Sequence, residues 1–157
     1  MAIENVREYF KNFGIENQIL EFDVSSATVE LAALAVGCEP EKIAKSMTFN
    51  IDGGCVMIIA AGDVKIDNAK YKAEFHTKAK MLSAEEALEK TGHAVGGICP
   101  FALNEGCRVF LDESLKRFEF VYPACGSSNS AIKLTPDELQ KYADSFVKWV
   151  DVCKPKM

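Results

Sequence analysis

The fold of this chain is decided by residues 45–61, KSMTFNIDGGCVMIIAA. Residues 46–51 and 55–61 are rich in apolar and β-branched side chains, and the Gly53-Gly54 pair between them is typical of a hairpin turn. The apolar run 56–61 has the length of a buried strand and is far shorter than the roughly 20 residues of a membrane span. The stretch therefore predicts a β-hairpin whose second strand is buried.

The segments on either side of this hairpin predict an α+β domain. Helical periodicity and capping residues mark residues 3–13, 26–36, 68–75, 83–92 and 135–146. Strand patterns mark residues 18–22, 107–111, 118–122, 131–134 and 147–152. Strands outnumber helices and do not alternate regularly with them. We therefore expect one compact domain over residues 1–157, with a curled mixed or antiparallel sheet flanked by helices rather than a doubly wound parallel sheet.

Composition places the chain among ordinary globular proteins. It has 157 residues, of which 48% are hydrophobic and 26% charged. The N-terminus lacks the basic and apolar regions of a signal peptide. The six cysteines are scattered without close pairs, and most lie in apolar stretches, which is typical of reduced, buried thiols. These features predict a cytoplasmic protein that does not associate with a membrane.

Charge is distributed unevenly along the chain. The formal net charge of -5 argues against a protein that coats nucleic acid over a wide surface. Residues 65–80, however, carry five lysines and His76 against only Asp67 and Glu74. This lysine-rich segment could hold one end of a polyanion, or it could be a solvated face without a partner.

The loop Gly96-Gly97-Ile98-Cys99-Pro100 is the strongest candidate for a binding site. Glycine lets the main chain approach a ligand closely or adopt a positive φ, and proline stiffens the end of the loop. Such a loop can present N–H groups to an oxygen atom, and Lys45 at the head of an apolar strand would supply a positive charge beside it. The combination predicts recognition of a small anionic or carbonyl-bearing ligand, although each feature alone could be a plain connector or a surface charge.

Two other kinds of chemistry are open to the same region. A zinc site could be built from His93, Cys99 and Cys107, but their spacing lacks the usual ligand pairs. A cysteine hydrolase could use Cys99 as nucleophile and His93 as base, an arrangement that depends on geometry rather than on spacing. The chain has no nucleotide-binding glycine motif, H-E-x-x-H motif or C-x-x-C motif.

Five segments, in order, resemble those of the YbaK/prolyl-tRNA-synthetase-associated domain family of aminoacyl-tRNA deacylases. They are IAKSMTF at 43–49, AGDVKID at 61–67, TG at 91–92 with GGICPF at 96–101, VFLDESL at 109–115 and ACGSSNSAI at 124–132. The resemblance runs from about residue 39 to residue 139, and residues 1–38 match mainly in pattern. It implies a compact α+β domain around a barrel-like mixed sheet.

The resemblance also implies roles for individual residues. Lys45 is expected near the terminal phosphate or the ester oxygens. The backbone of Gly96 and of its loop neighbours, Gly97 among them, is expected to hold the substrate carbonyl and a water or the ribose hydroxyl, and Pro100 would keep the loop rigid. The remaining substrate-binding candidates are Met47, Ile98 and Cys99 for the depth of the pocket, Asp112 and Asn129 for amino-group or ribose contacts, and Gly126. The lysine-rich segment, independently of the resemblance, offers Lys70, Lys72 and Lys78 as candidates to hold the tRNA acceptor end. Family members often carry serine at the loop position of Cys99. Neither a metal nor a cofactor is implied.

The function implied in this way is hydrolysis of mischarged aminoacyl-tRNA by a deacylase acting in trans. The ester between amino acid and ribose is already activated, so positioning and oxyanion stabilisation matter more than a strong nucleophile. An alternative is a non-catalytic module of the same fold that binds tRNA or an aminoacyl-tRNA synthetase. Which amino acid is removed, from which tRNA, stays open at this point.

Overall fold

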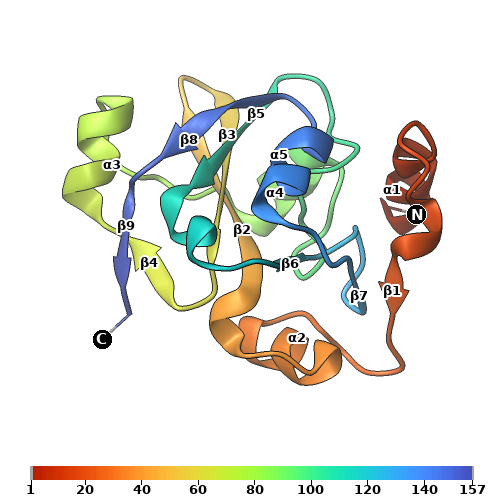
Figure 1. Cartoon of the computed structure of the whole chain (residues 1–157). Helices are drawn as coiled ribbons and strands as arrows, with labels where there is room; N and C mark the ends of the chain where they lie inside the picture. Colours follow the sequence, from red (N-terminus) through yellow and green to blue (C-terminus); the bar gives the residue numbers. More distant parts are fainter. Residues whose placement is uncertain (1, 157) are drawn as a thin grey trace.

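The computed structural model of the chain describes residues 2–156 and is built on a five-stranded mixed sheet (Figure 1). Across the sheet the strands are β6 (Tyr122–Pro123), β2 (Ile43–Ile51), β3 (Gly54–Ala61), β5 (Cys107–Asp112) and β8 (Phe146–Val150). Only the β2–β3 pair is antiparallel, and the other three neighbouring pairs are parallel. The curled mixed sheet expected from the sequence is confirmed.

Two small antiparallel sheets complete the strand framework. One pairs β1 (Leu20–Glu21) with β7 (Ser130–Ala131), and the other pairs β4 (Val64–Ile66) with β9 (Cys153–Pro155). Each joins segments that are far apart in the sequence, so each ties an end of the chain to the body of the domain. The sequence does not predict β4, because a three-residue strand is too short to show a period of two.

The central hairpin forms as expected, with a shift of one residue in its turn. Gly54 pairs with Ile51, so the two turn residues are Asp52 and Gly53 rather than the glycine pair. Their φ values are 53° and 79°. A two-residue turn of this kind needs a positive φ at both positions, and Asp-Gly is a preferred sequence for it.

Five α-helices surround the strands. They are α1 (Ala2–Lys11), α2 (Val29–Val36), α3 (Asn68–Phe75), α4 (Ala84–Thr91) and α5 (Pro136–Tyr142), together with the 3₁₀ helices η1 (Glu16–Gln18), η2 (Pro40–Lys42) and η3 (Glu113–Arg117). Both predicted capping boxes are present, one at Ser83 with Glu86 and one at Thr135 with Glu138. Within residues 2–156, no helix is long and apolar enough to cross a bilayer.

The predicted boundaries fail in the C-terminal third of the chain. Helix α5 ends at Tyr142 instead of residue 146, because the chain is already extended at Ala143 and β8 begins at Phe146. The predicted strand 147–152 is divided between β8 and β9. The predicted strand 131–134 is shortened to its first residue, which pairs in β7, and an isolated bridge between Val121 and Leu134.

A further correction concerns residues 113–122. The expected strand 118–122 is reduced to an isolated bridge at Val121 and to Tyr122, which begins β6, and η3 occupies the preceding residues 113–117. The Asp112 carboxylate accepts a hydrogen bond from the Ser114 N–H and so caps this 3₁₀ helix. An aspartate such as Asp112 can stand at the end of a strand as well as cap a helical turn. The sequence pattern alone therefore does not distinguish a strand end from the start of a 3₁₀ helix.

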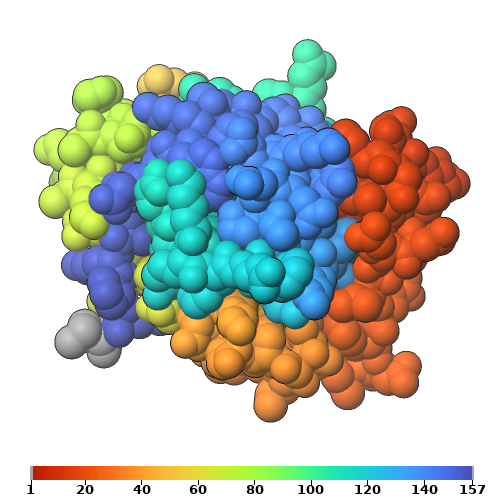
Figure 2. All heavy atoms as spheres, in the orientation of Figure 1, coloured from red at the N-terminus to blue at the C-terminus, as the bar shows by residue number. Residues whose placement is uncertain are grey.

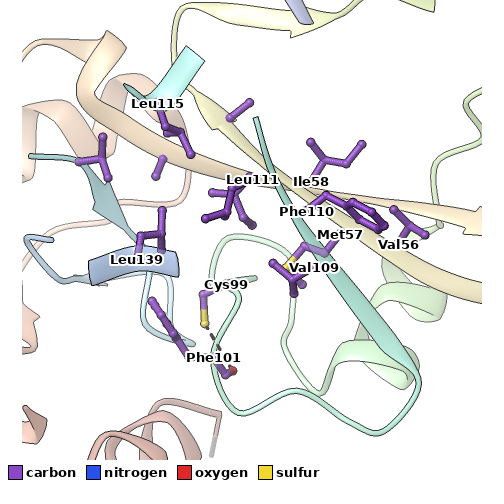
Figure 3. Packing of buried hydrophobic residues seen from close by; sticks show 14 of the residues in the cluster. Val56, Met57, Ile58, Cys99, Phe101, Val109, Phe110, Leu111, Leu115 and Leu139 are labelled. Carbon is purple, nitrogen blue, oxygen red and sulfur yellow. Dashed lines mark hydrogen bonds between the residues drawn. The ribbon is translucent and has the colours of Figure 1, made fainter. Parts of the chain in front are cut away.

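The core lies against β3 and β5. All residues from Val56 to Ala61 are fully buried, as the apolar run predicts. Figure 3 shows Val56, Met57 and Ile58 of β3 and Val109, Phe110 and Leu111 of β5 in one cluster with Leu115, Leu139 and two residues of the loop that follows α4, Cys99 and Phe101. Burying a side chain such as Phe101 contributes about 1.5–3 kcal/mol. The glycine-containing loop is therefore anchored in the core rather than free at the surface.

Helix α2 covers the lower edge of the sheet. Its residues Ala32 and Ala33 pack with Ile43 of β2, and Tyr122 of β6 packs against the same small cluster. In Figure 2 the orange residues of α2 lie directly below the cyan segment that contains β6, while the red N-terminal segment forms the side of the molecule. This edge, where α2 meets the start of β2, is where the candidate site lies.

Candidate functional site

A cavity of about 210 Å³ lies between α2, the start of β2, the glycine-containing loop and the segment from β6 to β7. Its walls are formed by residues within 26–32, 43–46, 95–98 and 122–131. Most of these residues are small or apolar, among them Ala27, Ala32, Ala44 and Ala124. A cavity of this size with such walls fits a small ligand or the small end of a large one.

Among the described residues, Lys45 is the only lysine or arginine in the walls of this cavity. It is the third residue of β2, and its Nζ donates a hydrogen bond to the carbonyl oxygen of Val64 in β4. Burial, and secondarily the charge of Lys156, lower the pKa of Lys45 from its ordinary 10.5 to about 8. A half-buried ammonium group with one backbone partner keeps further donors for a ligand and interacts strongly with an anion.

Gly96 and Gly97 allow the loop to pack closely against neighbouring segments of the chain. Gly96 has a φ of 98°, and a Cβ atom there would lie 3.2 Å from the Cβ of Ala27. A Cβ atom on Gly97 would lie only 2.6 Å from the backbone nitrogen of Ser127. The Gly97 carbonyl also accepts a hydrogen bond from the Gly126 N–H at 3.1 Å. Two neighbouring segments can therefore approach only because these positions lack side chains.

The main chain of the loop is partly engaged. The Gly97 N–H donates to the Ala94 carbonyl at 3.0 Å, so this donor closes a turn inside the loop. At the other end, the Pro100 carbonyl accepts from the Asp144 N–H at 2.7 Å. The loop is thus fixed at both ends, as expected for a rigid wall, and Gly96 is the glycine that lines the cavity.

Two serine hydroxyls in the cavity walls have no hydrogen-bond partner among the described residues. They are Ser26 Oγ and Ser46 Oγ, and both atoms are buried. A buried hydroxyl without a partner costs about 1–3 kcal/mol, so such groups usually mark a place where something else supplies the partner. The sequence pattern did not single out either residue, since neither the direction of a side chain nor the lack of a partner is visible in a sequence.

The three residues predicted to set the depth of the substrate pocket lie in different places. Ile98 lines the cavity. Cys99 is fully buried on the opposite side, in the core, with its thiol 3.9 Å from the Phe101 carbonyl (Figure 3). Met47 packs against the core and is outside the cavity walls. The structure thus brings together Lys45, Gly96 and Ile98 and separates them from Met47 and Cys99.

The Cys99–His93 pair has the properties of a structural contact. The two side chains do meet, with 3.6 Å between Cys99 Sγ and His93 Nε2, but Nε2 also lies 2.7 Å from the Phe101 carbonyl oxygen. Burial lowers the pKa of His93 and raises that of Cys99 to about 12. A reactive cysteine needs a thiolate and access to substrate, and this buried thiol is neutral near pH 7. The structure therefore does not favour the cysteine-hydrolase interpretation.

The zinc candidate is also not assembled. Cys107 lies in β5 and contacts Cys55 of β3, with 2.9 Å between the two sulfur atoms, instead of joining His93 and Cys99. Among residues 2–156, no three histidine, cysteine, aspartate or glutamate side chains are grouped in a way that would hold a metal ion.

Asp112 and Asn129 hold protein segments together. Asp112 is buried, and its carboxylate accepts hydrogen bonds from the N–H groups of Ser114 and Val152, both at 3.0 Å. Asn129 donates from Nδ2 to the Phe22 carbonyl at 3.0 Å. Neither residue lines the cavity, and the same is true of Gly126. The amino-group or ribose contacts predicted for Asp112 and Asn129, and the substrate contact predicted for Gly126, stay predictions that no contact among the described residues favours.

The three lysine candidates lie on and near α3, away from the cavity (Figure 1). Lys70 is ion-paired with Asp151, with 3.1 Å between Nζ and Oδ1, and also donates to the Cys153 carbonyl. Lys72 and Lys78 instead line a second hollow, of about 420 Å³. Of the three lysines predicted to hold the tRNA acceptor end, only Lys72 and Lys78 therefore line a hollow of the surface.

Comparison with known proteins places this geometry in a family. The model of the aminoacyl-tRNA editing domain matches residues 24–142, a range that includes all four segments of the cavity wall. The uncharacterized protein YwhH of Bacillus subtilis (strain 168) is 52% identical over 155 residues, which cover 98% of each chain. The proline–tRNA ligase of Lysinibacillus sphaericus (strain C3-41) is 31% identical over 90 residues, which cover 57% of this chain and 16% of that enzyme.

Solved structures agree with these sequence matches. A crystal structure described as that of a proposed trans-editing enzyme for prolyl-tRNA synthetase superposes with a TM-score of 0.86 at 27% identity, covering 98% of this chain and 97% of that one. The resemblance drawn from the five sequence segments is thereby confirmed. The family model includes all the cavity-wall segments, and the solved structure superposes on nearly the whole chain. The chain therefore belongs to the aminoacyl-tRNA editing domain family.

Proposed function

We propose that this protein hydrolyses the ester of mischarged aminoacyl-tRNA, with the esterified amino acid held in the cavity beside Lys45. The observation that carries this proposal is the pairing of one half-buried ammonium group with a small, mostly apolar cavity in a member of an editing family. The ammonium group matches a phosphate or a carbonyl oxygen that gains negative charge, and the small cavity matches an amino-acid side chain.

The reaction needs few groups from the protein. A water molecule adds to the ester carbonyl carbon, and the bond from that carbon to the ribose oxygen then breaks. The amino acid leaves as its carboxylate, and the ribose regains its hydroxyl. In this proposal the charge of Lys45 stabilises the developing negative charge, the main chain of Gly96 contacts the ester, and Ser26 and Ser46 offer their hydroxyls to polar atoms of the aminoacyl group.

Release of labelled amino acid from a panel of mischarged tRNAs tests the proposal. The panel carries alanine, serine, threonine and cysteine on several tRNAs. We expect hydrolysis of at least one of them well above the rate without protein. Binding of charged tRNA without hydrolysis of any ester would instead favour the non-catalytic module.

The pH dependence of the reaction follows from Lys45. Its pKa of about 8 means that it is cationic below that pH and neutral above it. If the cation is the active form, kcat/KM, corrected for hydrolysis without protein, falls as the pH rises through about 8. The residual activity of Lys45→Arg, which stays charged, should not fall in this range. A rise of kcat/KM through pH 8 would show instead that the neutral amine acts, for example as a base.

Removing the Ser46 hydroxyl should change activity and stability in opposite directions. We expect Ser46→Ala to lower kcat/KM about tenfold, the cost of a typical lost hydrogen bond, while the melting temperature stays the same or rises. Ser114→Ala is the matched control, because the Ser114 hydroxyl accepts a hydrogen bond from the Ala61 N–H outside the cavity. That variant should lose stability and keep its activity. Full activity of Ser46→Ala would show that this hydroxyl does not contribute to the reaction.

Lys72 and Lys78 are proposed to contact the acceptor end of the tRNA. Changing both to glutamate should raise KM for charged tRNA about tenfold. The slope of its dependence on salt concentration should fall by the amount that corresponds to about two lost phosphate contacts. Hydrolysis of a short aminoacyl-nucleoside should not change. The exposed pair Lys133 and Lys141, changed to glutamate in the same way, is the charge-matched control. Equal KM values in wild type and in the Lys72/Lys78 variant, at low and physiological salt, would show that other residues hold the tRNA.

A further inference from the structure

Cys55 and Cys107 face each other across the two central strands, at the opposite end of β2 and β3 from the cavity. They are direct register partners in the parallel β3–β5 pair, and their sulfur atoms lie 2.9 Å apart. Both are free thiols and almost fully buried, at 3% and 1% exposure. No step of the proposed deacylation uses either of them.

The backbone around this pair suits a covalent bond between the two sulfur atoms. Neighbouring strands lie about 4.8 Å apart. Disulfides join residues whose Cα atoms are about 4.4–6.8 Å apart, so strand partners can be bridged without separating the strands. The side chains also already point at each other, since their sulfur atoms are in contact. Only a small rotation of the two side chains is needed to bring the sulfur atoms to bonding distance.

A hollow of the surface borders one of the two cysteines. It has a volume of about 290 Å³, and its walls are formed by Cys55 with Gly53, Gly54, Asn104 and Gly106, by the carboxylate residues Glu89 and Glu105, and by Lys90. The Lys90 Nζ is fixed at this hollow by a hydrogen bond to the Gly53 carbonyl at 2.7 Å. Cys107 is not among the residues that line the hollow, and its sulfur atom contacts that of Cys55.

The contact between the two sulfur atoms shifts the two acidities in opposite directions. It lowers the pKa of Cys55; burial opposes this shift, and the charge of Lys90 adds a smaller lowering. The same contact raises the pKa of Cys107. Since Cys55 is the one of the two cysteines that borders the hollow, we assign it the first reaction with a reagent. Burial raises the pKa values of Cys99, Cys125 and Cys153 instead.

We propose that Cys55 and Cys107 form an intramolecular disulfide when the protein meets a two-electron oxidant of the peroxide class. The Cys55 thiolate attacks a peroxide oxygen, the O–O bond breaks, and Cys55 becomes a sulfenic acid. The Cys107 sulfur then attacks the Cys55 sulfur, the S–O bond breaks, and water leaves with the Cys107 proton. Two thiols are oxidised to one disulfide, and hydrogen peroxide is reduced to two molecules of water.

This bond would close residues 55–107 into a loop that contains α3, α4 and the wall of the cavity at Gly96. Closing a loop of this length restricts the unfolded chain, so a disulfide that fits the native geometry stabilises the fold. We expect the oxidised protein to melt several degrees above the reduced protein. The inference does not depend on the proposed deacylase activity.

The test is peptide mapping of the full chain after treatment with hydrogen peroxide. Remaining thiols are alkylated, and trypsin releases Cys55 in the peptide 46–65 and Cys107 in the peptide 91–108. We expect these two peptides to be linked, and the link to disappear on reduction. Since the second peptide also contains Cys99, the link should persist in Cys99→Ala, and fragment ions of the wild-type pair should assign it to Cys107.

A second variant distinguishes the two steps. In Cys107→Ser the link should be absent, and Cys55 should be trapped as a sulfenic acid by a dimedone-type reagent. Three results would overturn the proposal. They are unlinked peptides with both cysteines alkylated or over-oxidised, a link that maps to Cys99, and a melting temperature that falls on oxidation of the wild-type protein.

Discussion

Lys45→Ala is expected to lower the rate of deacylation by about a hundredfold to a thousandfold. The loss corresponds to about 3–4 kcal/mol of transition-state stabilisation, which is typical when one pre-positioned charge or donor is removed from an active site. Lys45 is the only cationic side chain among the described residues of the cavity walls, and its charged neighbour Lys156 lies outside those walls. The fold should remain intact, because the depressed pKa shows that the protein already disfavours this buried charge.

Two variants separate charge from packing in this experiment. Lys45→Met keeps the length of the side chain without its charge and should be as slow as Lys45→Ala. Lys65→Ala removes an exposed lysine from the adjacent strand β4 and should leave the rate unchanged. Rates are measured in single turnover, with melting temperatures as the check on folding. Near-wild-type hydrolysis by Lys45→Ala would remove Lys45 from the mechanism.

Gly97→Ala is expected to have the largest effect on the structure of the site. The added Cβ atom would lie 2.6 Å from the backbone nitrogen of Ser127 and 2.7 Å from the carbonyl carbon of Gly126. Backbone atoms cannot rotate away as the end of a side chain can, so the two segments must separate. We expect a loss of about 2 kcal/mol or more in the free energy of unfolding, measured by urea titration.

The same movement should reduce activity through Gly96, which lines the cavity next to this contact. A displacement of the loop by about 1 Å can cost a hundredfold in rate. Gly54→Ala is the matched control, because it also lacks a positive φ and its Cβ atom would be 3.3 Å from the Ile51 carbonyl oxygen, far from the cavity. It should change stability and activity only slightly. Equal behaviour of the two variants would contradict the role given to Gly97.

The parts of the fold that the sequence predicts well are those set by local chemistry. The hairpin is fixed by its apolar run and its turn residues, and the helix over Asn68–Phe75 is bounded by the Asp67 cap and by His76 in a left-handed conformation. Helix α4 follows in the same way from its capping box at Ser83. Each of these signals acts over a few residues, so it can be recognised without the rest of the chain.

The errors have a common cause in long-range contacts. The strand pairing of β8 with β5 ends α5 four residues early, although the helical pattern continues locally. In the candidate site, Lys45 and the loop are recognisable from their residue types and receive their roles from a resemblance, whereas Ser26 and Ser46 are missed because their lack of partners is a property of the folded chain. The side of the loop on which Cys99 lies is likewise decided by the core around Phe101.

The central claim is that the cavity beside Lys45 holds the esterified amino acid. The most direct measurement is titration of isotope-labelled protein with a non-hydrolysable aminoacyl-adenosine amide, followed by backbone NMR chemical shifts. We expect the largest changes at residues 26–28, 43–46 and 95–98, and we expect these changes to be lost in Lys45→Ala. Changes confined to α3 and the hollow around Lys72, or no saturable change anywhere, would contradict this claim.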